Sequence, residues 1–224
     1  MRPLRVEDLG LRAYREVLEL QRELRRCRIE GTLAEDVLLL VEHPPVVTLG
    51  RGTRGSSLPL APVALERRGV EVFEVERGGD VTLHAPGQLV GYPILDLRQH
   101  RQDLHWYLRS LEDVLIQALD SLGIEACRTP GRTGVWTAGR KIASMGIHVK
   151  QWVTLHGFAL NVTTDLDLFD LIVPCGIPQV VMTSVAAELL REGDATLMPP
   201  VREKVVGSFC DVFEASAVTA TGII

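Results

Sequence analysis

The stretch Lys141–Val162, with the sequence KIASMGIHVKQWVTLHGFALNV, decides the fold. Two strand-like runs, 141–149 and 152–162, flank a loop of two residues, so the stretch predicts a β-hairpin. In this register Ser144 lies opposite Gly157. The loop lacks the glycine or asparagine that tight hairpin turns favour, which leaves the register open by one residue.

Outward from the hairpin, the sequence alternates between short strand-like runs and amphipathic segments. Alternating or continuous apolar residues predict strands at residues 36–42, 46–49, 70–76, 81–84 and 88–95. A period of 3.6 residues predicts helices at residues 9–28, 104–122, 183–191 and 200–214. Residues 50–62 are rich in glycine, serine and proline and are predicted to form a loop. Strands in hairpin order together with segregated helices indicate an α+β fold rather than a parallel Rossmann sheet.

Composition limits the classes of function. The chain has 224 residues, 46% of them apolar, and we expect one domain over residues 1–224. Its net charge of -5 and aromatic share of 5% argue against nucleic-acid binding. No apolar run approaches a membrane span, and Met1–Glu7 lacks a signal-peptide pattern, so the expected location is cytoplasmic. Because zinc spacing and glycine-rich phosphate loops are missing from the sequence, we expect no metal and no cofactor.

Cys175 is the strongest candidate for a nucleophile. An apolar run ends in Pro174-Cys175-Gly176, where proline fixes one backbone angle and glycine frees the next. Such a bend can present a thiol next to backbone groups. A free thiol is only about 3% ionised at pH 7, so a nucleophile needs an activating partner. A buried structural cysteine is the alternative interpretation.

Lys141 is the candidate for that partner. The chain has 24 basic residues, of which only those at positions 141, 150 and 204 are lysines. Arginine keeps its proton at any usable pH, whereas a partly buried lysine can exchange one. An ammonium at position 141 would favour the thiolate of Cys175, and a neutral amine could accept a proton. A solvated lysine at the end of a strand is the alternative.

A third segment, Arg77–Gln88, brackets polar residues with three glycines and a proline. Glycines let a ligand approach the backbone closely. His84 in this segment could orient a substrate carbonyl or a neighbouring group. We interpret His43 and His156 as structural residues at strand ends, and His100 as an exposed loop residue.

Six segments, in this order, resemble the lipoyl(octanoyl) transferase family. They are Glu42-His43-Pro44-Pro45 with Thr48-Leu49-Gly50-Arg51, Arg77-Gly78-Gly79 with Thr82, His84 and Pro86-Gly87-Gln88, Gly134-Val135-Trp136, Lys141-Ile142-Ala143, His156–Asn161, and Pro174-Cys175-Gly176 with Thr183-Ser184. They span about two-thirds of the chain, residues 42 to 188. Val47 and Met145 depart from the family's usual aromatic and small aliphatic residues, which bears on the shape of an acyl pocket. The resemblance implies the fold of the biotin/lipoate protein ligase catalytic domain, a mixed, mostly antiparallel sheet with helices packed outside.

The resemblance also implies an activity. An octanoyl group would pass from octanoyl-acyl carrier protein to a lysine ε-amine on a lipoyl domain of a 2-oxoacid dehydrogenase complex or on the glycine cleavage H protein. Cys175 would carry the acyl group as a thioester and Lys141 would act as acid and base, with no need for ATP. The implied substrate-binding residues are Arg77, Gly78, Gly79, Asp80, Val81, Thr82, Leu83, His84, Ser144, Met145, Gly146, Gly157, Phe158 and Ala159. Among them, Leu83, Met145 and Phe158 are expected to line a groove for the acyl tail.

Other functions remain open from the sequence. An ATP-dependent lipoate or biotin protein ligase of the same fold is the main alternative, and a non-catalytic module that binds carrier proteins is another. A cysteine hydrolase is disfavoured because no histidine and asparagine pattern accompanies the cysteine. Residues 1–28 contain eight arginines and five acidic residues. They could form a basic face that docks an acidic carrier protein, or simply a solvated helix face.

Overall fold

The computed structural model describes residues 1–177 and 179–219, so residue 178 and the end of the predicted domain, residues 220–224, lie outside the described chain. The strands are β1 (Arg2–Leu11), β2 (Asp36–Glu42), β3 (Val46–Leu49), β4 (Glu71–Glu74), β5 (Val81–His84), β6 (Gln88–Ile94), β7 (Val135–Thr137), β8 (Arg140–Lys150), β9 (Val153–Asn161) and β10 (Ala215–Thr219). The helices are α1 (Tyr14–Glu30), α2 (Pro62–Glu66), α3 (Leu104–Asp120), α4 (Val185–Glu188) and α5 (Met198–Val212). Short 3-10 turns lie at Gly55–Ser57, Leu166–Leu171, Pro174–Gly176 and Ala195–Leu197.

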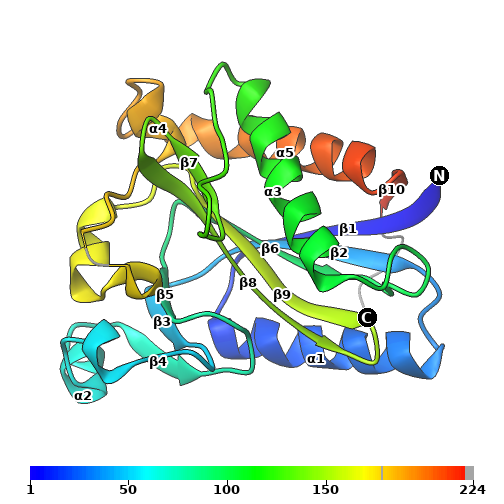
Figure 1. Cartoon of the computed structure of the whole chain (residues 1–224), viewed down its shortest axis with the longest axis horizontal. Helices are drawn as coiled ribbons and strands as arrows, with labels where there is room; N and C mark the ends of the chain where they lie inside the picture. Colours follow the sequence, from blue (N-terminus) through cyan, green and yellow to red (C-terminus); the bar gives the residue numbers. More distant parts are fainter. Residues whose placement is uncertain (178, 220–224) are drawn as a thin grey trace.

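The described strands form two sheets (Figure 1). The larger sheet has the strand order β10-β1-β2-β6-β9-β8-β7, and the smaller has the order β4-β3-β5. β1 runs parallel to β10 and β2, and β3 runs parallel to β4, whereas the other neighbours are antiparallel. The predicted α+β class, with a mixed and mostly antiparallel sheet, is therefore confirmed.

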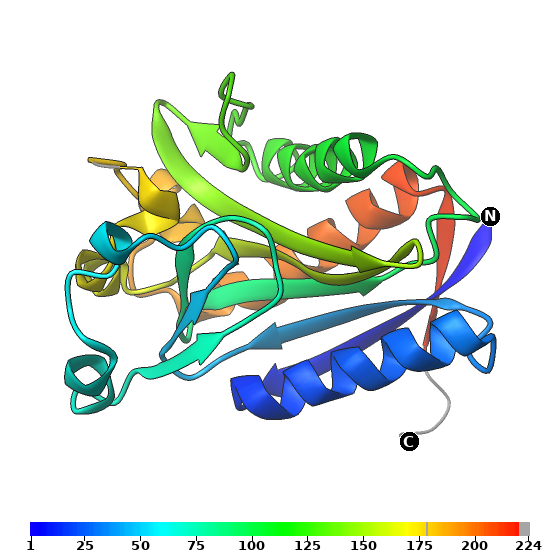
Figure 2. The same cartoon turned by 60° about the horizontal axis from the view of Figure 1, so that its bottom comes forward.

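Helices cover both faces of the larger sheet (Figures 1 and 2). Leu38 and Leu40 of β2 face the layer of α3 and α5, whereas Val37, Leu39 and Val41 face α1. All five side chains are completely buried, which explains why this strand has a continuous apolar sequence. Each of these buried side chains contributes roughly 1.5–3 kcal/mol to stability. No helix in the described part of the chain has both the length and the apolar character to cross a bilayer.

The predicted hairpin is confirmed, but its loop lies one residue further along the chain. β8 and β9 are joined by Gln151-Trp152, whose φ angles of 50° and 63° are both left-handed. This backbone is typical of the turn that matches the twist of a two-residue hairpin. Ser144 therefore pairs with Ala159 and not with Gly157, which pairs with Gly146. Because moving the loop by one residue shifts each partner by two, the same side chains still share a face.

The predicted helix over residues 9–28 is wrong at its start. α1 begins at Tyr14, and the residues before Arg12 form β1. Leu9 fits the helical spacing by coincidence, and Gly10 interrupts the strand with a φ of 61°. The partners of β1 are β2 and β10, and β10 lies at the opposite end of the sequence, so local periodicity carries no signal for this pairing.

Three shorter elements also differ from the sequence predictions. The loop predicted at residues 50–62 leads into α2, which begins at Pro62, because proline is favoured in the first turn of a helix. The helix predicted at residues 183–191 is the single turn α4, and Leu190 after it has a φ of 54°. The helix predicted at residues 200–214 is present as α5, but the chain then adds β10, which was not predicted.

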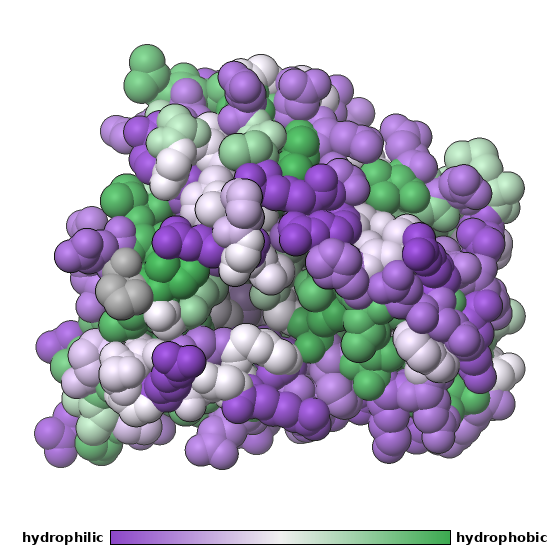
Figure 3. All heavy atoms as spheres, in the orientation of Figure 1, coloured by the Kyte–Doolittle hydropathy of each residue, from purple (hydrophilic) through white to green (hydrophobic). Residues whose placement is uncertain are grey.

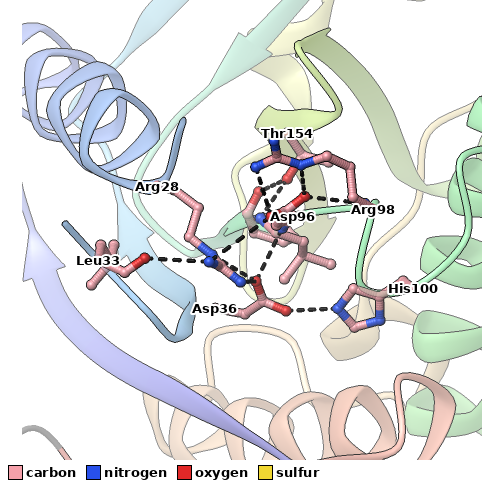
Figure 4. Close-up of polar contacts among 9 residues, drawn as sticks. Arg28, Leu33, Asp36, Asp96, Arg98, His100 and Thr154 are labelled. Atoms are coloured by element: carbon pink, nitrogen blue, oxygen red, sulfur yellow. Dashed lines mark hydrogen bonds and ion pairs between the residues drawn. The ribbon is translucent and has the colours of Figure 1, made fainter. Parts of the chain in front are cut away.

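A buried ionic cluster ties α1 to the sheet at the start of β2 (Figure 4). The Arg28 guanidinium donates to the Asp36 carboxylate at 3.1 Å, and both side chains are about 95% buried. The His100 Nε2 lies 2.6 Å from the other oxygen of the same carboxylate, and the Asp96 N–H donates to Asp36 at 3.0 Å. His100 is therefore buried, so its prediction as an exposed loop residue is wrong. Removing one partner from such a cluster costs about 3–5 kcal/mol, because a buried charge is left without compensation.

Candidate active site

Cys175 lies in the turn Pro174–Gly176 and is half-buried. Its backbone is left-handed, with φ 56° and ψ 19°, which costs a residue other than glycine about 1–2 kcal/mol. Gly176 follows with a φ of 64°, and a Cβ atom there would overlap the carboxylate of Asp80. The Ser57 hydroxyl donates to that carboxylate at 2.7 Å. The Pro-Cys-Gly sequence thus forms the expected sharp bend, with the Asp80 carboxylate packed over it.

The Lys141 ammonium meets the Cys175 thiol. Nζ lies 3.0 Å from Sγ, although 34 positions separate the two residues in the sequence. The lysine side chain is completely buried, so its position in the second residue of β8 does not make it a solvated strand end. Nζ also donates to the Thr133 carbonyl at 3.3 Å and lies 5.0 Å from the centre of the Trp136 ring. These contacts hold the ammonium beside the sulfur.

The backbone of Lys141 is anchored by the segment Val181–Thr183. The lysine N–H donates to the Val181 carbonyl at 2.8 Å, and the Thr183 N–H donates to the lysine carbonyl at 2.9 Å. These two bonds form a short parallel bridge between β8 and the chain beyond Cys175. The pairing thus fixes the position of Lys141 through a segment that follows Cys175 closely in the sequence.

A cavity of about 580 Å³ opens beside Cys175. The Ser144 hydroxyl lies 3.9 Å from Sγ at its wall. The cavity lies between the segment 77–84, strands β6, β8 and β9, and the loop Gly131–Thr133. Figure 3 shows a hollow near the middle of the face in view, with apolar side chains next to it. Among the described residues, no group of three or more histidine, cysteine, aspartate or glutamate side chains could hold a metal ion.

The segment that begins at Arg77 lies directly on β8. The Gly78 N–H donates to the Ile147 carbonyl at 2.9 Å. A Cβ atom at Gly146 would lie 2.9 Å from the Arg77 side chain, so this strand position requires a residue without a side chain. The Arg77 guanidinium is buried and donates to the Thr48 carbonyl at 2.6 Å. These contacts close one wall of the cavity.

The structure brings nearly all of the predicted site residues to this cavity. Its lining includes Cys175 and the predicted residues Arg77, Gly78, Gly79, Asp80, Val81, Thr82, His84, Ser144, Met145, Gly146, Gly157, Phe158 and Ala159. Two predicted residues are not part of the lining. Lys141 instead contacts the Cys175 Sγ through its Nζ. Leu83 was expected in the acyl groove but is not among the residues that line the cavity. It is completely buried in the core under the smaller sheet, because alternate side chains of β5 point to opposite faces.

The sequence of the chain was compared with family models and with known proteins. The family model described as "Lipoyl protein ligase A/B catalytic domain" matches residues 13–209. The chain belongs to this family. It is 54% identical over 172 residues to an octanoyltransferase of Gloeobacter violaceus, a match that covers 77% of this chain and 75% of the relative. It is 48% identical over 214 residues to an octanoyltransferase of Solibacter usitatus, with 96% and 94% covered. The resemblance inferred from the motifs is confirmed, and the family member described here is an acyltransferase.

Solved structures of ligases share the fold of this family member. A lipoate-protein ligase A bound with ATP superposes with a TM-score of 0.70 at 16% identity, covering 98% of this chain and 89% of the ligase. At this identity the likeness concerns the fold alone. The predicted biotin/lipoate protein ligase fold is confirmed by it.

Several residues of the cavity were missed from the sequence. They are Tyr14, Val90, Tyr92, Leu108, Gly131, Arg132, Thr133, Ile147, His156, Gly176 and Ile177. The sequence predicted a helix at Tyr14 and a strand at Tyr92, but nothing in the local pattern indicates that these two residues line a cavity. His156 was interpreted as structural, yet the residue is part of the cavity lining, and its Nε2 is buried without a hydrogen-bond partner among the described residues.

Burial keeps the histidines around the cavity neutral. Burial lowers the pKa of His84 to about 3 and that of His43 to about 4, and it also lowers the pKa of His156. The Glu76 carboxylate lies close to His156, with 3.8 Å between Oε2 and Nε2. The His156 ring and the Arg22 guanidinium hold the pKa of the Glu76 carboxyl well below its usual range. The histidines that line the cavity are thus neutral, and the arginines of its lining are Arg77 and Arg132, while Lys141 contacts the thiol.

Proposed function

We propose that this protein transfers an octanoyl group from octanoyl-acyl carrier protein to a lysine ε-amine of a lipoyl domain, through a thioester on Cys175. The observation that carries the proposal is the distance of 3.0 Å between the Lys141 Nζ and the Cys175 Sγ at the wall of an apolar cavity. The names of the relatives, octanoyltransferase, support the octanoyl group. The family description, lipoyl protein ligase, supports a lipoyl-domain acceptor.

In the first step the Cys175 thiolate attacks the carbonyl carbon of the donor thioester. The bond from that carbon to the pantetheine sulfur breaks as the bond to Sγ forms. The Lys141 ammonium gives its proton to the departing pantetheine thiolate and becomes a neutral amine. The acyl group stays activated as a thioester, so the step needs no ATP.

In the second step the neutral amine of the acceptor lysine attacks the acyl carbon. The amide bond forms as the bond to Sγ breaks, and Lys141 accepts the proton that the attacking nitrogen releases. This restores the thiolate and ammonium pair. Because the acyl group waits on the enzyme between the two steps, two bulky carrier proteins can use one site in turn.

The developing oxyanion needs a donor fixed near Sγ. The N–H groups of Gly78 and Gly176 already donate to the carbonyls of Ile147 and Val173. We assign the oxyanion to the N–H of Cys175 itself, for which no hydrogen bond within the described residues is found. The apolar tail would extend along Phe158 and Met145, which line the cavity.

The intact mass of the protein after incubation with octanoyl-acyl carrier protein tests the proposal. We expect an octanoyl adduct that hydroxylamine removes and that is missing in Cys175→Ala. The adduct should disappear when a lipoyl domain is added, with octanoylation of that domain. Cys210→Ala is a matched control, since Cys210 lies on α5 outside the cavity, and it should leave the adduct unchanged. Lack of an adduct in the wild-type protein would refute the thioester route.

An ATP-dependent ligase is the second candidate, because a ligase bound with ATP shares the fold. Incubation with ATP and free octanoate or lipoate discriminates the two. Acceptor modification from free acid and ATP, with none from the acyl-carrier thioester, would favour the ligase. The proposed transferase gives the opposite result. Acceptors to compare are lipoyl domains of 2-oxoacid dehydrogenase complexes and the glycine cleavage H protein.

A further inference from the structure

Three motif residues outside the proposed chemistry form one chain of hydrogen bonds that ends at His84. The Asn161 side-chain Nδ2 donates to the Thr183 carbonyl at 2.9 Å. The Gln88 Nε2 donates to the Asn161 Oδ1 at 2.9 Å. The Gln88 Oε1 lies 2.7 Å from the His84 Nδ1. Gln88 and Asn161 are 98–99% buried, so no solvent competes for these bonds.

The direction of this chain is fixed by two backbone carbonyls. A carbonyl can only accept, so the Thr183 carbonyl requires the amide nitrogen of Asn161 and turns its Oδ1 toward Gln88. Oδ1 and the Leu83 carbonyl then both require the amide nitrogen of Gln88, which donates to Leu83 at 3.3 Å. The Gln88 oxygen is left facing His84. Since this oxygen only accepts, the His84 Nδ1 must carry the proton.

The other ring nitrogen of His84 is then an acceptor. Nε2 forms no hydrogen bond within residues 1–177 and 179–219, and it is not among the buried polar atoms that are sealed without a partner. His84 lines the cavity, so Nε2 opens onto it. A neutral imidazole with its lone pair directed into a substrate site can accept a hydrogen bond from an N–H group.

The anchor of this chain also anchors the catalytic lysine. Thr183 gives its carbonyl to Asn161 and its N–H to the carbonyl of Lys141. One residue therefore joins the two sides of the cavity, the His84 side through side-chain amides and the Lys141 side through the backbone.

We propose that Gln88 and Asn161 are positioning residues that hold the His84 imidazole with Nδ1 protonated and Nε2 accepting, so that Nε2 receives an N–H hydrogen bond from bound substrate. The proposal rests on the proposed function. Two substrates carry a suitable N–H, the pantetheine arm of the donor through its amides and the acceptor through its lysine amine. The first would act in acylation of Cys175, and the second in transfer from it.

The surroundings of His84 favour the neutral ring. Around the ring lie Arg77 of the 77–84 segment, His43 of the β2–β3 turn and His156 of β9. A positive charge on any of these groups lowers the pKa of His84, because it repels a proton on the ring. Tyr14 of α1 stacks on the ring with 6.1 Å between centroids. With its pKa lowered to about 3 by burial, His84 keeps one proton across the physiological pH range. The identity of the protonated nitrogen is then set by Gln88 alone.

NMR of the histidine rings tests the proposal without any activity measurement. In protein labelled with ¹³C and ¹⁵N in its six histidines, the His84 resonances are assigned by loss in His84→Gln. We expect the wild-type ring to be neutral from pH 5 to 8 with the proton on Nδ1. A wild-type ring with the proton on Nε2 would overturn the proposal, whatever the protein does with acyl groups.

Two variants of Gln88 then separate positioning from a purely structural role. Gln88→Glu places a carboxylate against Nδ1, so the pKa of the His84 ring should rise, and the doubly protonated ring, which has no acceptor, should form at a higher pH than in the wild type. Gln88→Met removes the partner and should leave a mixture of tautomers. Single-turnover rates of acylation and of transfer should be measured for both, and the step that uses Nε2 should slow by about 2- to 13-fold. Unchanged rates in both steps, in variants whose ring state has changed, would refute the role.

Thr154→Val is the matched control for loss of a buried hydrogen bond. Thr154 is completely buried, accepts from the Leu95 N–H and donates to the Pro93 carbonyl, and it lies outside the cavity. We expect this variant to lower thermal stability while leaving the His84 ring state and both single-turnover rates as in the wild type. A change in its ring state would show that general loosening of the core, rather than Gln88, sets the tautomer.

Discussion

Lys141→Met tests the pairing of the ammonium with the thiol. Methionine has nearly the same length and fits a completely buried position, but it removes the charged donor 3.0 Å from Sγ. A hydrogen bond from a charged group contributes about 1.5–3 kcal/mol. Since 1.36 kcal/mol corresponds to a factor of ten, the stabilisation of the thiolate should fall by roughly 10- to 150-fold.

The assay is the rate at which iodoacetamide alkylates Cys175 at pH 7, followed by the mass of the peptide that carries it. The rate should fall by up to about 30-fold, because the thiolate is the reacting species and a free thiol is still about 3% ionised at pH 7. Acyl transfer should fall by a further 100- to 10,000-fold, about the usual contribution of acid–base catalysis, because methionine exchanges no proton.

Lys204→Met is the control, since Lys204 is exposed on α5, and both of its rates should match the wild type. An alkylation rate in Lys141→Met within about twofold of the wild-type rate would refute the reasoning, because the thiolate would then owe nothing to the lysine.

Four further outcomes are expected. The free energy of unfolding from urea titrations should be about 3 kcal/mol lower at pH 5.5 than at pH 8. His43 and His84 have pKa values lowered to about 4 and 3 in the folded protein, so they take up protons at pH 5.5 only when the chain unfolds. Equal free energies at the two pH values would contradict this. Gly176→Ala should abolish the octanoyl adduct, because its Cβ atom would overlap the carboxylate packed over the Cys175 turn. Gly193→Ala is the control, since Gly193 has a φ of 77° and open space around it. This variant should keep the adduct and lose only about 1 kcal/mol of stability. Leu83→Ala should lower the free energy of unfolding by about 2–5 kcal/mol and leave the preference among hexanoyl, octanoyl and decanoyl donors unchanged; an altered preference would return this side chain to the acyl groove. Turnover with acyl carrier protein should weaken steeply with added salt if the arginines of residues 1–28 dock it, and a flat response would argue against that face.

The sequence indicated the pair Cys175 and Lys141, which the structure brings into contact, better than it indicated the boundaries of the site. Cys175 and Lys141 were recognisable because Pro-Cys-Gly forms a bend and because lysine is rare in a chain full of arginine. Their contact depends on the bridge from β8 to Val181 and Thr183, a pairing between segments about 40 positions apart that no local pattern encodes.

The misplaced elements have the same physical origin. β1 and β10 pair with each other from opposite ends of the described chain, so neither has its partner nearby in sequence. The hairpin register depended on the backbone of Gln151 and Trp152, two residue types that give little indication of a left-handed turn. His100 was misjudged because its partner, Asp36, lies on a distant strand.

The tether on the Lys141 ammonium has a protective consequence. A neutral amine beside a thioester is itself a nucleophile, and capture of the octanoyl group by Lys141 would give an amide that the enzyme could not reverse. The Thr133 carbonyl and the Trp136 ring contact Nζ beside the sulfur, and the side chain that carries it is completely buried. In the proposed mechanism, these contacts would keep the lysine in place to pass protons and would also disfavour its own acylation.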